Sequence, residues 1–150
     1  LERRRLGADC GRVDLVIQVK GLPPNFEDIL KVFPAAAGPN TIFAYGDVIY
    51  VPSGNDLPQE LYDHERVHGA RQTQAGVESW WKLYLEDPVY RRDEEVVAHR
   101  AEYSSYCARN RDRNVRSRYL AQISARLASP LYGHLMSPRE AQRLIVDKLR

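Results

Sequence analysis

The chain has 150 residues, of which 43% are apolar and 28% charged, and its formal net charge is +2. These values are typical of a globular protein with one hydrophobic core, so we expect a single domain over residues 1–150. They argue against a strongly basic nucleic-acid reader, and no apolar run approaches the roughly 20 residues of a membrane span. Two cysteines, Cys10 and Cys107, are too few for a disulfide framework, and the sequence does not show whether they pair.

The first third of the chain predicts a small β-sheet. Residues 13–19 are β-branched and apolar, which indicates a strand. Asn25 is placed to cap a short helix over 26–33. Two short β-rich runs within 41–51 flank Gly46-Asp47, a pattern that predicts a hairpin.

The middle of the chain predicts a long helix. Asp56 is positioned as its N-cap, Pro58 falls in the first turn and Gly76 marks the stop, so we expect a helix over about 57–74. Polar and apolar residues at helical spacing share one stripe of this helix: Leu61, His64, His68 and Gln72.

The remaining chain predicts further helices. Residues 77–85 carry aromatic and leucine side chains suited to a core-packing helix, and Asp87-Pro88 is a cap signal for the next one, which should run to Arg109. A charged connector over 110–114 precedes a helix over 115–128. Ser137-Pro138-Arg139-Glu140 reads as a capping box that opens a last helix, to Leu149. The fold class expected is therefore α+β, mostly helical, with a small N-terminal sheet.

The stretch His64-Glu65-Arg66-Val67-His68 has the pattern His-Glu-x-x-His. Residues four apart lie on the same face of a helix, so both imidazoles can point at one metal ion. Glu65 can then take a proton from water activated by that ion. The pattern predicts a zinc-dependent hydrolase with His64 and His68 as ligands and Glu65 as general base.

A catalytic zinc usually has three protein ligands, so a third one is needed. The branch of zinc peptidases with a third histidine close behind the motif is excluded, because Arg71 and Gln74 occupy the matching positions. The helix after Pro88 offers four further candidates: Glu94, Glu95, His99 and Glu102. Glu95 is favoured, with Ala98 one turn on to allow a close approach of the two helices, but Glu94 has the same small neighbour and stays in contention.

His64-Glu65-x-x-His68, followed by Glu95-x-x-Ala98 on a downstream helix, resembles the gluzincin metallopeptidases, in particular the compact lethal-factor-like and the bacterial and phage-encoded minimal zincins. The resemblance covers about residues 41–109. It implies a zincin-like fold whose sheet edge strand borders the active-site helix, Zn²⁺ held by His64, His68 and Glu95, and a peptide or protein substrate. Gly69, directly after the second histidine, departs from a good helix sequence and indicates a bend or close packing.

Stabilising the oxyanion of peptide hydrolysis requires another hydrogen-bond donor. The candidates are Tyr132 and His134, which fall in an expected loop, and also Tyr103 and Tyr106. A substrate peptide could add alongside the strand expected at Val48–Val51.

Two other functions compete with the peptidase. The first is a zincin-like binding or structural module without hydrolytic activity, which would not need Glu65. The second is nucleic-acid binding through the arginine-rich run at 109–118, although such runs are usually solvated connectors. The first residues lack the apolar stretch of a signal peptide, so we expect a cytoplasmic protein or one released without a recognisable signal. No oligomeric state is predicted.

Overall fold

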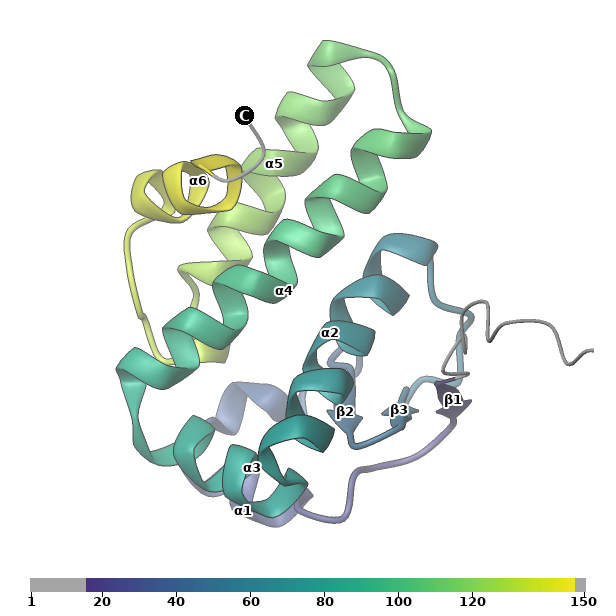
Figure 1. Cartoon of the computed structure of the whole chain (residues 1–150), viewed down its shortest axis with the longest axis vertical. Helices are drawn as coiled ribbons and strands as arrows, with labels where there is room; N and C mark the ends of the chain where they lie inside the picture. The colour runs from purple at the N-terminus through teal and green to yellow at the C-terminus, as the bar shows by residue number, and fades with distance from the viewer. Residues whose placement is uncertain (1–15, 148–150) are drawn as a thin grey trace, which may run out of the picture.

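The structure is a computed structural model that describes residues 16–147 of the chain. Its elements are β1 (Ile17–Val19), α1 (Phe26–Val32), β2 (Phe43–Tyr45), β3 (Val48–Tyr50), α2 (Gln59–Ala75), α3 (Val77–Glu86), α4 (Pro88–Arg109), α5 (Arg113–Leu127) and α6 (Pro138–Asp147). Short 3₁₀ turns lie at Pro34–Ala37 and Pro130–Tyr132. The predicted class, α+β and mostly helical with a small sheet, is confirmed (Figure 1).

The sheet has the strand order β1-β3-β2. The predicted hairpin is present, with β2 antiparallel to β3 and Ala44 opposite Ile49. β1 pairs with β3 in parallel, with Gln18 opposite Ile49. The expectation that a peptide adds alongside Val48–Val51 is therefore wrong, because β3 is the central strand and both of its edges are already paired. The predicted first strand keeps Ile17–Val19, and its residues 13–15 lie outside the described part, as does Cys10.

The two ends of α2 differ in how well the sequence predicted them. Gly76 ends the helix with a φ of 89°, a conformation that favours glycine. Asp56 is not the N-cap. The cap position is Pro58, whose backbone is still extended, and no side chain caps the first turn. The helix begins at Gln59 because the residue before a proline is pushed out of the helical region, which keeps Leu57 outside the helix.

Gly69 brings the β2–β3 turn into direct contact with α2. A Cβ atom at this position would lie 2.4 Å from the carbonyl oxygen of Gly46. No side chain fits there, so the glycine predicted to mark a bend or close packing marks a close approach. α2 contacts both β2 and β3.

Gly69→Ala is expected to destabilise the protein despite the better helix propensity of alanine. The propensity gain is about 1 kcal/mol, whereas overpacking costs about 1–3 kcal/mol. Since the opposing atom belongs to the backbone of a tight turn, we expect the upper part of that range and a lower Tm by circular dichroism. Ala70→Gly, at the exposed neighbouring position, is the control and should lose only the propensity of about 1 kcal/mol. A Tm above wild type for Gly69→Ala would show that the close contact is absent.

Gln72 fixes the edge strand to the same helix. Its side chain is 0% exposed. Its Nε2 donates to the carbonyl of Ala44 at 3.0 Å, and its Oε1 accepts from the backbone N–H of Gly46 at 2.7 Å. Edge strand β2 is thereby held along α2, in line with the expectation that an edge strand of the sheet borders the helix that carries the motif.

The described residues form two hydrophobic cores. One joins α1, β2 and α3 and is centred on Trp80, Trp81 and Tyr84, as the aromatic run at 77–85 predicted. The other joins α4, α5 and α6 and contains Leu120, Ile123, Leu127 and Ile145. α2 and α4 run side by side between the sheet and the α5–α6 pair (Figure 1). The most extensive contact between helices is thus the one between α2 and α4, and the motif residues lie on α2.

The helix ends after α3 follow the expected signals in part. The Asp87 side chain accepts from the backbone N–H groups of Val89 and Tyr90, which confirms the predicted cap of α4. α5 begins earlier than expected, since Asp112 caps it through Asn114 and Val115. Ser137 accepts from the N–H of Glu140, one half of the predicted capping box.

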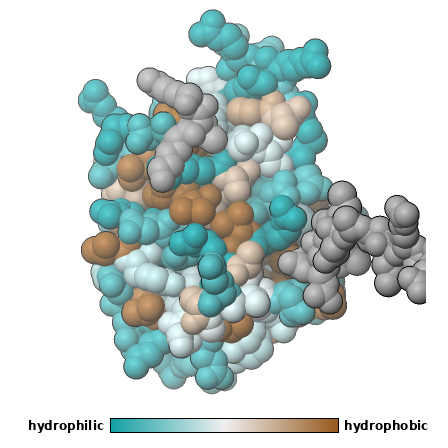
Figure 2. Space-filling view, in the orientation of Figure 1, coloured by the Kyte–Doolittle hydropathy of each residue, from teal (hydrophilic) through white to brown (hydrophobic). Residues whose placement is uncertain are grey.

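The face shown in Figure 2 is mainly hydrophilic, with apolar side chains gathered near its middle, over α4. Within residues 16–147, no helix has the length and apolar character needed to cross a membrane.

Candidate metal centre

The motif residues lie on the inner face of α2, toward α4. His64, Glu65 and His68 are 3%, 9% and 5% exposed. The four-residue spacing places the two imidazole rings one above the other, with their centroids 4.9 Å apart. Arg66, between them, is exposed to solvent.

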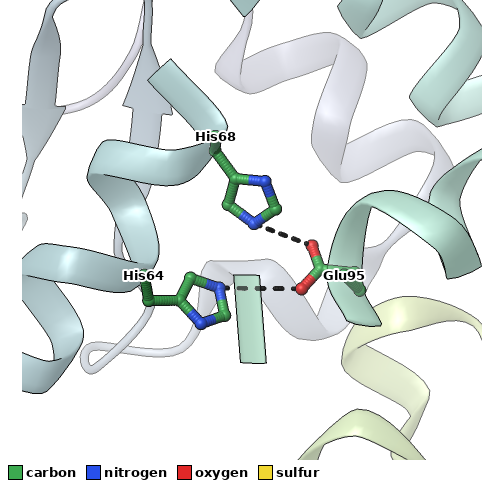
Figure 3. A group of neighbouring side chains, drawn as sticks. All are labelled: His64, His68 and Glu95. Carbon is green, nitrogen blue, oxygen red and sulfur yellow. Dashed lines mark ion pairs between the residues drawn. The ribbon is translucent and has the colours of Figure 1, made fainter. Parts of the chain in front are cut away.

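Glu95 on α4 completes the group. Its Oε1 lies 3.3 Å from Nε2 of His68, and its Oε2 lies 3.6 Å from Nε2 of His64 (Figure 3). Two ligands bound to one tetrahedral zinc at about 2.0–2.1 Å stand about 3.3–3.4 Å apart. The separations match that spacing better than the distance of a good hydrogen bond. These three buried groups can hold a metal ion.

The donor set also fits an ion chemically. Oε2 of Glu95 is buried and, among the described residues, accepts no hydrogen bond. A buried carboxylate oxygen without a partner is costly unless a cation or a donor is supplied to it. Two imidazoles and one carboxylate are a ligand set that zinc takes in hydrolases.

Glu94, the alternative that the sequence left open, faces elsewhere. Its carboxylate binds the Arg71 guanidinium at both oxygens, at 2.6 and 2.7 Å, and also accepts from Trp80 Nε1 at 3.0 Å. These donors occupy Glu94 fully, and it belongs to no group of potential metal ligands among the described residues. The geometry therefore favours Glu95.

Glu102 contacts the ring nitrogen of His64 that faces away from Glu95, so it is not placed beside the three potential ligand atoms. Its Oε2 accepts from Nδ1 of His64 at 2.8 Å and from Arg126, and its Oε1 accepts from the Tyr119 hydroxyl at 2.6 Å. A carboxylate that takes the Nδ1 proton fixes the ring and leaves Nε2 free to bind a metal. The sequence offered a signal for this role, because Glu102 stands seven residues after Glu95 and so lies on the same face of α4.

His99 supports Glu95 from the same helix. Its Nδ1 donates to the Glu95 backbone carbonyl at 2.7 Å, and its ring lies 4.7 Å from that of His64. Burial, together with the nearby His64, lowers the pKa of His99 to about 3, so its imidazole is neutral. His64, His99 and Glu102 form a second possible ligand group. That group is the weaker candidate because Glu102 is already occupied by Arg126 and Tyr119.

A cavity of about 130 Å³ opens beside the first group. It reaches His64, Glu65, His68 and Glu95, whereas His99 and Glu102 do not line it. Its other walls are mainly apolar and come from α1, the β2 region and α3: Ile29, Phe33, Ile42, Phe43, Trp80 and Trp81. The cavity therefore combines an apolar chamber with one polar wall, the usual form of a small-molecule or peptide site. Leu61 and Gln72 also line it, so the whole predicted stripe of α2 faces the cavity.

The two carboxylates of this wall, Glu65 and Glu95, have pKa values shifted in opposite directions. Burial raises the pKa of Glu65, against the opposing influence of His64 and His68. Burial also acts to raise the pKa of Glu95, but His68 and the other imidazoles outweigh it and hold that pKa at about 2. Burial lowers the pKa of His68, and Glu95 outweighs it and raises that pKa to about 8. Glu95 is thus a fixed anion, while Glu65 holds a proton more readily than an ordinary glutamate.

Of the predicted oxyanion donors, the structure brings Tyr132 to the cavity. Arg91 holds the Tyr132 loop by donating from Nε to the Tyr132 carbonyl at 3.0 Å. His134 is exposed, has a φ of 55° and does not line the cavity. Tyr103 and Tyr106 also lie away from it, and Tyr106 stacks on Tyr119 with the ring centroids 3.7 Å apart.

The arginine-rich run at 109–118 is partly used within the fold. Arg109 pairs with Glu60 at 2.5 Å. Arg116 donates to the carbonyls of Asn110 and Cys107, joining the end of α4 to α5. These contacts give the run a structural role at the α4–α5 corner.

Comparison of the chain with protein-family models, with curated proteins and with solved structures gives no match. Function is therefore inferred from the geometry of the site.

Proposed function

We propose that the chain is a zinc-dependent metallopeptidase in which His64, His68 and Glu95 hold the ion and Glu65 is the general base. The observation that carries this proposal is the convergence of two imidazoles and a partly unpaired carboxylate on the polar wall of an apolar cavity. A closed structural site has no need of a second buried carboxylate beside its ligands. Glu65 supplies one, with its Oε1 4.0 Å from Nε2 of His64.

The chemistry follows from these groups. Zinc in such a site supplies a Lewis acid that lowers the pKa of water to near 7. Glu65 accepts a proton from the water that attacks the peptide carbonyl carbon, and returns it to the amine as the C–N bond breaks. Tyr132 is the candidate to donate a hydrogen bond to the carbonyl oxygen as that oxygen gains charge.

The shape of the cavity supports an extended peptide as substrate. β2 is paired on one side by β3 and lines the cavity with Phe43 and Ala44. Because Gln72 already takes the Ala44 carbonyl, an extended peptide would lie beside β2 and be held largely by its side chains in the cavity, rather than by a backbone ladder as expected for Val48–Val51. The apolar chamber then favours a substrate with a large apolar side chain next to the bond that is cut.

Removal of the metal is expected to abolish hydrolysis. Purified protein should contain a single zinc ion per chain by elemental analysis, and should cut a quenched fluorescent peptide library enriched in apolar residues. Dialysis against a chelator should remove both the metal and the activity, and stoichiometric zinc should restore them. Hydrolysis that persists in metal-free protein would contradict the proposal.

A further inference from the structure

Tyr84 is a buried tyrosine whose hydroxyl rests on the proposed third ligand. It donates to Oε1 of Glu95 at 2.5 Å, a short distance typical of a hydrogen bond to an ionised carboxylate. No spacing or capping signal in the sequence marked Tyr84, which was expected only to pack in the core. Tyr84 also lines the cavity, so the contact places a neutral donor in the same wall as the proposed ligands.

The ring of Tyr84 has little freedom to move away. It is 7% exposed and stacks on Trp80 with the ring centroids 4.8 Å apart and the planes at 17°. Trp81 and Phe33 meet it edge-on, at 5.3 and 6.4 Å. A hydroxyl carried by a ring packed on three sides is held in one place, so its hydrogen bond fixes its acceptor rather than following it.

The backbone of Tyr84 is tied to the same helix as Glu95. Its carbonyl accepts from the Arg91 guanidinium at 2.7 Å, and Arg91 stands one turn before Glu95 on α4. The Arg91 side chain also covers the Phe33 ring, 4.7 Å from its centroid. Both ends of Tyr84 are therefore anchored to α4, and α3 cannot shift along α4 without breaking one of the two contacts.

The two oxygens of Glu95 consequently have different surroundings. Oε1 takes the Tyr84 hydroxyl, whereas Oε2 is buried without a hydrogen-bond partner among the described residues and lies toward His64. Oε1 also lies 3.3 Å from Nε2 of His68, so both oxygens face the imidazoles, and Oε2 is the one that no protein donor occupies. A carboxylate fixed through Oε1 by a packed ring resists rotation away from the two imidazoles. The same relation holds for His64, whose ring is fixed by Glu102.

We propose that Tyr84 is a positioning residue that orients the Glu95 carboxylate toward the metal and thereby sets the zinc affinity of the site. The inference rests on the proposed metallopeptidase function, since it needs Glu95 to be a ligand. It adds a residue from α3 to a centre otherwise built from α2 and α4.

Tyr84→Phe tests this role because it removes the hydroxyl and keeps the packed ring. Zinc affinity is measured by competition with a chromophoric chelator, independently of turnover. Loss of a partner that orients a ligand typically weakens metal binding about 10–100-fold, and we expect a result in that range. The absorption spectrum of the cobalt-substituted protein should also change, because a freed carboxylate can bind through both oxygens and raise the coordination number.

Tyr90→Phe is the matched control. Tyr90 also packs against Trp80, with the ring centroids 6.3 Å apart, but it does not line the cavity. This variant should bind zinc as wild type does and keep the wild-type cobalt spectrum.

The outcomes separate the two proposals. If wild-type protein binds zinc and cuts peptides while Tyr84→Phe matches it in zinc affinity and cobalt spectrum, the role of Tyr84 is overturned and the metallopeptidase stands. If wild-type protein binds no zinc, both proposals fail. Equal weakening in Tyr84→Phe and Tyr90→Phe would assign the effect to general loosening of the packing around Trp80, between α3 and α4, and would also overturn the role.

Discussion

Glu65→Gln is expected to lower peptide hydrolysis by about 10²–10⁴-fold while the protein keeps its zinc. Glutamine has nearly the shape of glutamate but cannot accept the proton of the attacking water. The measurement compares kcat/KM on a fluorogenic peptide with the zinc content of the same sample. Glu65→Ala tests the same role with a smaller side chain.

The variant should not lose stability, which separates a chemical defect from a folding defect. Burial raises the pKa of Glu65, so the ionised form of this side chain is disfavoured in the folded protein. A raised carboxylate pKa means that the ionised group opposes folding once the pH exceeds its pKa in the unfolded chain. Glutamine carries no charge, so metal-free Glu65→Gln should have a Tm at neutral pH equal to or above that of wild type.

Glu60→Gln is the control for the substitution itself. Glu60 lies in the first turn of α2 and pairs with Arg109, away from the metal ligands. It should retain wild-type activity. If Glu65→Gln hydrolyses peptide as fast as this control, the general-base role is wrong. If no preparation hydrolyses peptide although zinc is bound, the alternative of a binding or structural module gains support.

Glu95→Gln is expected to lower the zinc affinity of the protein, whereas Glu94→Gln is expected to lower its stability. Glu95→Gln replaces an anionic ligand by a neutral amide and should weaken zinc binding at least about 100-fold, more than the loss of an orienting partner does. Glu94→Gln leaves the ligands in place and should bind zinc as wild type does. Its cost is structural, because the Arg71 guanidinium and Trp80 Nε1 lose their charged acceptor.

The stability change of Glu94→Gln should be about 1–3 kcal/mol, the usual cost of leaving donors without their partner, and no more, because Arg71 remains partly in solvent. Both variants are measured by zinc competition and by chemical denaturation. If Glu95 is the ligand, Glu95→Gln loses zinc affinity and Glu94→Gln keeps it but loses stability. The reverse pattern would make Glu94 the ligand. Retention of zinc by both would point to His99 or Glu102.

The sequence could predict those parts of the site that depend on one helix. His64 and His68 need only the four-residue spacing, and Leu61 and Gln72 fall on the same stripe. The hairpin, the Gly76 stop and the Asp87 cap are equally local. Each depends on a few neighbouring residues whose backbone preferences agree with the final fold.

What the sequence could not decide depends on how elements far apart meet. Adjacent residues on a helix point about 100° apart, so the choice between Glu94 and Glu95 is a question of how α4 is rotated. That rotation is set by tertiary packing, including Val96 against α5 and Arg71 against Glu94. The parallel pairing of β1 with β3 is likewise long-range, which is why Val48–Val51 gave no sign of being the central strand.

The Gln72 amide has a consequence for how copies of the molecule meet in solution. A bare edge strand is a template onto which another chain can add, and this is a common route to aggregation. On β2 the carbonyl of Ala44 is already taken by Gln72, as is the N–H of Gly46 beyond the strand, and β2 is three residues long. A second copy therefore finds too few free backbone groups for a stable ladder, whereas a short peptide can still be held largely by its side chains in the cavity. The buried Gln72 side chain therefore protects β2 from edge-to-edge pairing with another copy, although this strand borders the cavity.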